Sequence, residues 1–85
     1  MRAKIQLLFF ASLAERLNCA EEQLELPEEV DSVNALRLYL IDRGAPWNVL
    51  ASDQVRCAVN QEIATIDYPI RPGDEVAFFP PVTGG

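Results

Sequence analysis

Histidine is absent from this 85-residue sequence, and cysteine occurs only twice, at Cys19 and Cys57. Neither cysteine has a second one at the spacing of a metal site, so we expect no bound metal. The lack of histidine also removes the commonest general base and the usual partner of a nucleophilic serine or cysteine. The sequence therefore predicts that both cysteines are small apolar core residues. It also predicts that any chemistry is supplied by another protein.

Long apolar runs are missing as well. The apolar stretch over residues 5–17 is interrupted by Gln6, Glu15 and Arg16, whereas a helix that spans a bilayer needs about 20 apolar residues. The stretch also lacks the long apolar segment and the small-residue cleavage site of a signal peptide. We therefore expect a protein of the cytoplasm.

Basic residues are also scarce. The chain has 7 Lys and Arg residues against 13 Asp and Glu residues, which gives a formal net charge of −6. An acidic surface repels phosphate groups, so the sequence predicts no nucleic-acid or membrane partner. A protein with a basic surface is a better partner. The length and the 49% hydrophobic content fit one ordinary folded domain.

Apolar patterning predicts strands over residues 4–10, 23–26, 55–59, 62–66 and 75–79. Ser12 and Glu15 have the spacing of a capping box, which predicts a short helix that ends near Asn18. Asp31 or Ser32 is expected to cap a main helix over residues 33–43, and a shorter helix follows from residue 46. This order predicts an α+β fold, with a mixed sheet of about five strands and the main helix packed across one face.

The end of the sequence carries the expected chemistry. We expect a folded domain over residues 1–81 and a flexible tail over residues 82–85, since Pro80 and Pro81 cannot offer amides to continue a strand. Fully extended, four residues reach roughly 13–14 Å, and Gly84 and Gly85 have no Cβ to obstruct a narrow channel. A terminal carboxylate has a reference pKa of about 3.3–3.7 and is ionised at neutral pH. On Gly85 it can attack the α-phosphorus of ATP in a partner enzyme.

Three blocks, LFFA at 8–11, AVNQ at 58–61 and GDEVAFFPPVTGG at 73–85, resemble the sulfur-carrier (small) subunit of molybdopterin synthase. The resemblance implies a ubiquitin-like β-grasp fold and a role as sulfur carrier in molybdenum cofactor biosynthesis. It implies no permanently bound cofactor. A ubiquitin-activating-like adenylyltransferase would place ATP-derived AMP on Gly85, and a persulfide donor would then convert that group to a thiocarboxylate. The large subunit would hold the active site in a two-plus-two heterotetramer, which makes this chain the non-catalytic sulfur donor.

The resemblance also assigns roles to the residues near the end of the chain. Gly85 carries the adenylate and then the thiocarboxylate, and Gly84 gives clearance. Val82 and Thr83 are expected to line the partner's channel, and Phe79, Pro80 and Pro81 to contact the partner.

Alternation in the last strand places Phe78 and Phe79 on opposite faces, which makes Phe79 the candidate interface anchor. The alternative is that both rings belong to the core. Three other functions remain open: a carrier for thiamine synthesis or tRNA thiolation, a ubiquitin-like protein modifier, and a β-grasp binding module with an inert tail.

Overall fold

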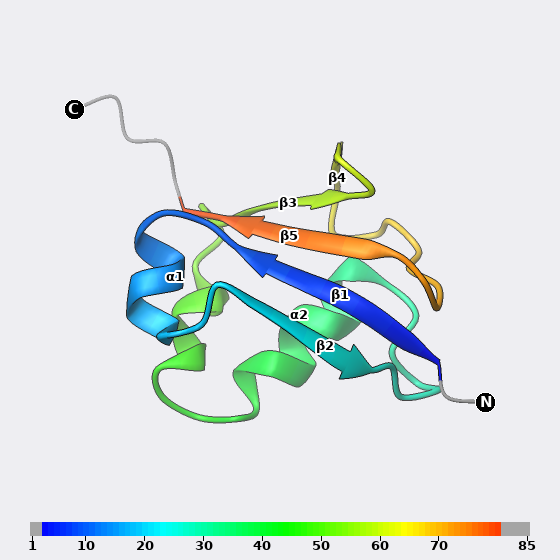
Figure 1. Ribbon diagram of the computed structural model, residues 1–85, viewed down its shortest axis with the longest axis horizontal. Coiled ribbons are helices and arrows are strands. Elements are labelled where there is room, and N and C mark those ends of the chain that lie inside the picture. The colour runs from blue at the N-terminus through cyan, green and yellow to red at the C-terminus, as the bar shows by residue number, and fades with distance from the viewer. Residues whose placement is uncertain (1–2, 81–85) are drawn as a thin grey trace.

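The computed structural model describes residues 3–80, which form one mixed sheet of five strands with helices on one side (Figure 1). In chain order the elements are β1 (Lys4–Phe9), α1 (Ser12–Leu17), β2 (Glu21–Glu25), α2 (Val33–Ile41), the 3-10 helix η1 (Trp47–Ala51), β3 (Arg56–Val59), β4 (Glu62–Ala64) and β5 (Glu75–Phe79). The strand order is β2-β1-β5-β3-β4, with β1 and β5 parallel and the other neighbours antiparallel. The predicted α+β architecture is confirmed.

The core lies between α2 and the inner face of the sheet. Every second residue of β1 and β5 points inward, and α2 supplies Val33, Leu36 and Leu40 at the spacing of one helix face. The buried strand residues on this face are Ile5, Leu7, Phe9, Leu24, Cys57, Val59, Val76 and Phe78. No helix within residues 3–80 is long and apolar enough to cross a bilayer.

The main helix begins as predicted and ends two residues early. The Ser32 hydroxyl accepts a hydrogen bond from the Ala35 amide at 3.1 Å, which confirms one of the two predicted caps. After Ile41 the amides of Arg43 and Gly44 donate to carbonyls three residues back, so the last turn is tighter than an α-helix. Gly44 has a φ of 89°, a left-handed conformation that glycine adopts without steric cost.

The predicted capping box is wrong. Ser12 is the first residue of α1, and its side chain makes no capping hydrogen bond. The Phe10 amide still donates to the Phe78 carbonyl of β5 at 3.2 Å, so the chain leaves the sheet only after Phe10. Ala11 alone must turn it into the helix, and it does so with a φ of 52°. The predicted end of this helix at Asn18 is confirmed.

Two strand boundaries differ from the prediction by two residues because their partners set them, and three others differ by one residue. β2 begins two residues early, since β1 pairs with it as far as Leu8 opposite Glu21. β4 ends at Ala64 instead of residue 66, because the Ile66 carbonyl accepts a hydrogen bond from the Asn34 amide at 2.9 Å. That bond draws the chain away from the sheet toward the start of α2.

The turn at residues 71–74 is tied to the turn between β3 and β4. The carboxylate of Asp74 accepts from the Asn60 side-chain amide at 3.0 Å and from the Arg71 backbone amide at 2.8 Å. The Glu75 amide donates to the Asn60 side-chain oxygen at 3.0 Å. Asn60 therefore fixes the start of β5, the strand that leads to the end of the chain.

Candidate functional site

The site is built from the last strand outward. β1 and β5 run parallel and end at the side of the sheet where α1 lies (Figure 1). Phe78 points into the core and is 1% exposed, whereas Phe79 lies half-buried on the opposite face. The hypothesis that one aromatic residue is core and the other lies outside is therefore confirmed, and the alternative that both are core is wrong.

Phe79 forms a stacked pair with Phe10, the residue that follows β1. Their ring centroids are 4.9 Å apart with an interplanar angle of 6°, and Phe10 is 42% exposed. The packing of each ring on the other holds both in place on the solvent side. Exposed rings fixed in this way lose little conformational entropy on binding, which suits them as anchors for a partner.

An apolar row crosses the same outer face. By strand register Leu8 lies beside Ala77, Ala77 beside Ala58, and Ala58 beside Ile63. The two alanines form a low floor, and Ile63 at its edge is 77% exposed. Ala58 and Ala77 are themselves only 4% and 5% exposed, so the accessible apolar atoms of this face belong to Phe10, Ile63 and, in part, Leu8 and Phe79. Accessible apolar side chains gathered on one face mark interaction sites. We call this surface the docking face and define it by six residues: Leu8, Phe10, Ala58, Ile63, Ala77 and Phe79.

The described chain ends at the docking face. Pro80 follows Phe79 directly and is half-buried, against a hollow of about 270 Å³ that α1 and η1 line with Leu13, Arg16 and Val49. Pro81, Val82, Thr83, Gly84 and Gly85 lie outside the described residues, so their predicted roles stay predictions. The structure thus places the predicted Phe79 and Pro80 at this face and adds five residues that the sequence did not indicate as site residues: Leu8, Phe10, Ala58, Ile63 and Ala77.

The thiols do not belong to this site. Cys57 is buried in the core, and burial raises its pKa from 9.0 to about 12. Cys19 is half-buried, and its pKa is also raised, first by desolvation and then by the nearby Glu22 carboxylate. Both are protonated at neutral pH and are poor nucleophiles. Within residues 3–80 no cluster of Cys, Asp and Glu could hold a metal ion.

Comparisons with known proteins agree with this geometry. A model of the ThiS family matches residues 7–85. The molybdopterin synthase sulfur carrier subunit of Escherichia coli (strain K12) is 39% identical over 82 residues, which cover 95% of this chain and 99% of that relative.

Two solved structures share the fold. SAMP1 from Haloferax volcanii, a small archaeal modifier protein, has a TM-score of 0.75 at 25% identity, over 96% of this chain and 99% of that chain. A chain of the complex of subunits 1 and 2 of molybdopterin-converting factor from Helicobacter pylori 26695 has a TM-score of 0.64 at 18% identity, with the same coverage. These likenesses confirm the predicted ubiquitin-like β-grasp fold.

Proposed function

The chain belongs to the ThiS family, and we propose that it is the sulfur-carrying subunit of a molybdopterin synthase. One observation carries the proposal: the identity with the E. coli carrier subunit extends over nearly the whole of both chains. The family match also runs through Gly84 and Gly85 to the last residue. It therefore includes the segment on which a carrier depends.

The position of the docking face explains how a partner could reach the end of the chain. A partner that covers Phe10 and Phe79 also covers the point where the described chain ends, at Pro80. Binding energy from the apolar face can therefore hold the residues after Pro80 in the partner's active site. Remote binding energy of this kind converts a bimolecular transfer into an effectively unimolecular one.

The proposed cycle uses the carboxylate of Gly85 three times. Its oxygen attacks the α-phosphorus of ATP and pyrophosphate leaves, which gives an acyl-adenylate. The terminal sulfur of a donor persulfide then attacks the acyl carbon and AMP leaves, and a thiol reduces the resulting acyl disulfide to the thiocarboxylate. Finally the thiocarboxylate sulfur bonds to a carbon of the pyranopterin precursor and displaces an oxygen substituent of that carbon, and water then cleaves the acyl–sulfur bond, which restores the carboxylate and leaves the sulfur on the precursor.

Three partners are required by this cycle. The Helicobacter pylori complex supports the large synthase subunit as the acceptor, and we propose the two-plus-two heterotetramer for it. A ubiquitin-activating-like adenylyltransferase and a persulfide donor complete the set, and AMP is held on Gly85 only in transit. We place the cycle in the cytoplasm, where a reducing environment keeps thiols such as Cys19 and Cys57 free.

Intact mass spectrometry tests the proposal. The chain is incubated with a cognate adenylyltransferase, ATP, magnesium and a persulfide donor. We expect the mass gain of one oxygen-to-sulfur exchange, localised to Gly85, and no gain in a variant that lacks Gly85. The Gly84→Ala variant should fold normally and fail to transfer sulfur.

Two results would contradict the proposal. Normal turnover by either tail variant would exclude the tail as the carrier. Isopeptide adducts on lysines of many proteins, with no thiocarboxylate, would instead assign the chain to the protein modifiers. The similarity to SAMP1 favours that second candidate.

A further inference from the structure

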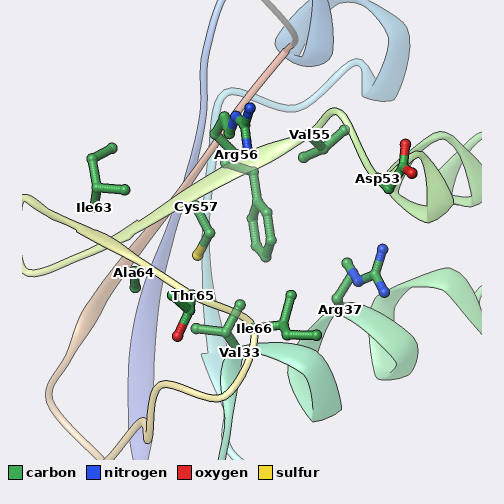
Figure 2. Close-up of a pocket in the computed structure, with 11 residues that line it drawn as sticks. Val33, Arg37, Asp53, Val55, Arg56, Cys57, Ile63, Ala64, Thr65 and Ile66 are labelled. Atoms are coloured by element: carbon green, nitrogen blue, oxygen red, sulfur yellow. The ribbon is translucent and has the colours of Figure 1, made fainter.

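A groove opens on the helix side of the sheet, away from the docking face (Figure 2). β4 pairs with β3 only from Val59 to Cys57. Beyond that pair the Ile66 carbonyl is bonded to the Asn34 amide and the Tyr68 carbonyl to the Val33 amide, each at 2.9 Å. The chain therefore crosses from the sheet to the start of α2. The space left between this crossing, the end of β3 and α2 is the groove.

The groove has an apolar trench and one polar end. Its volume is about 360 Å³, within the range of sites that bind small ligands or the side chains of a peptide. Ile66 forms one wall and is 54% exposed, and Ile63 stands at the rim. The remaining apolar lining is Val33, Val55, Cys57, Ala64 and Phe78.

Arg37 occupies the polar end of the groove (Figure 2). One terminal nitrogen of its guanidinium donates to the Leu50 carbonyl at 3.2 Å, and the other donates to the Asn34 side-chain oxygen at 3.1 Å. These bonds hold the group in one orientation and leave a second N–H on each terminal nitrogen. Within residues 3–80 Arg37 forms no ion pair, and its Nε is buried without a hydrogen-bond partner. The remaining terminal N–H groups, rather than the buried Nε, are therefore the donors that can bind a partner's carboxylate.

The other charged residues at the groove leave this cation dominant. Arg56 and Cys57 project from opposite faces of β3, so the Arg56 guanidinium points away from Arg37 (Figure 2). Asp53 lies at the same end as Arg37 but is exposed, so solvent screens its charge more than that of the half-buried arginine. In a chain of net charge −6, the groove offers an uncompensated cation beside an apolar trench.

We propose that this groove is a second docking site for the large synthase subunit. It takes a segment of that partner in which a branched aliphatic side chain stands next to a carboxylate. The aliphatic side chain packs against Ile66, and the carboxylate binds Arg37. Ile63 belongs both to the docking face and to the rim of the groove, so one partner can cover both surfaces without a gap. This inference rests on the proposed function.

Calorimetric titration of the full-length chain with its large subunit tests the groove. We expect Arg37→Gln and Ile66→Ser each to weaken binding about tenfold, a loss typical of an interface residue that contributes to affinity. The affinity of Arg37→Lys should fall between those of Arg37→Gln and the wild type, because an ammonium keeps the charge but lacks the two parallel N–H donors of a guanidinium. Asp53→Asn should strengthen binding about twofold, since it removes a like charge from the carboxylate's site.

Matched controls separate the groove from general effects. Leu38→Ser changes an α2 residue that is 52% exposed, nearly as exposed as Ile66, and Arg71→Gln removes the same charge outside the groove. Both should bind within about twofold of the wild type. Increasing salt should weaken binding of the wild type more steeply than binding of Arg37→Gln.

Each other outcome has one meaning. If the wild type binds and both groove variants bind equally well, the groove assignment is wrong and the proposed function stands. If the controls lose as much affinity as the groove variants, the effect is not specific to the groove and the assignment is again wrong. If the folded wild type does not bind the large subunit at all, the proposed function fails, and the groove assignment fails with it.

Discussion

Replacing Phe79 with alanine separates the aromatic pair's role in folding from its role in docking. In the free chain the half-buried ring loses part of its burial energy and its stack on Phe10 at 4.9 Å. A fully buried side chain of this kind contributes about 1.5–3 kcal/mol and a stacked pair about 0.5–1.5 kcal/mol more. We therefore expect Phe79→Ala to lower the free energy of unfolding by about 2 kcal/mol, which leaves the chain folded.

The effect on docking should be as large in free energy and easier to isolate. An aromatic anchor at the centre of an interface contributes about 2 kcal/mol or more, which corresponds to about 30-fold in the dissociation constant. Affinity for the large subunit is measured by calorimetry, and urea unfolding gives the stability of each variant. Because the two rings touch, Phe10→Ala should weaken binding as well, and the double variant should lose less than the sum of the single losses.

Tyr39→Ala is the matched control, since Tyr39 lies on α2 and is 40% exposed, close to the 42% of Phe10. It should leave the affinity unchanged within about twofold. The reasoning fails if Phe79→Ala and Phe10→Ala bind the large subunit as tightly as the wild type does. It also fails if Tyr39→Ala weakens binding to the same extent, because the effect would then not belong to the docking face.

Three further predictions concern the scaffold. Asp74→Ala removes two hydrogen bonds, one of them from Asn60, and should lower the urea unfolding free energy by about 1–2 kcal/mol; an unchanged value would show that water replaces both. Arg43→Ala removes a paired contact to Glu22 and a stack on an indole ring at 4.5 Å, and should cost about 1 kcal/mol in thermal melts, less in high salt. Burial raises the pKa of Cys57 from 9.0 to about 12, so between these values the unfolded chain releases a proton that the folded chain keeps. Stability should therefore fall with rising pH there, by up to about 1.4 kcal/mol per pH unit relative to Cys57→Ala, and parallel profiles would refute this.

Local sequence patterns were sufficient to predict the structure wherever the chemistry of one residue determines it. Ser32 can cap α2 because its own hydroxyl accepts a hydrogen bond from an amide three residues on, and Asn18 ends α1 because asparagine adopts a left-handed conformation more readily than most residues. Alternation in β5 placed Phe78 and Phe79 on opposite faces, since successive side chains of a strand face opposite ways; the structure shows that Phe78 is the inner one. These features depend on interactions between residues close together in the sequence, so they can be predicted from the sequence alone.

The errors at α1, β2 and β4 have a different cause, because each depends on a partner distant in the sequence; the early end of α2 is a local tightening of its last turn. Ala11 rather than Ser12 precedes α1, so the helix begins one residue earlier than the capping box predicted, directly after the hydrogen bond that ties Phe10 to β5. β4 stops at Ala64 because the backbone amide of Asn34, about thirty residues earlier, donates a hydrogen bond to the Ile66 carbonyl. A local pattern of apolar residues gives no sign of a hydrogen bond to a residue so far away in the sequence.

The same long-range bond explains why the docking face could be partly foreseen and the groove could not. Phe79 lies in a regular strand, so alternation placed it on the face opposite Phe78, and the other residues of the docking face follow from the strand pairing, which the sequence does not show. The groove exists because residues 65–66 no longer pair with β3 and approach the start of α2 instead. Ile66 then lines the groove on one side and Arg37 lies at its polar end. In the sequence these two residues read as the end of a strand and a polar position on a helix. Surfaces made by departures from regular structure therefore have to be found in the fold. This one holds Arg37, which forms no ion pair within residues 3–80, and shares Ile63 with the docking face.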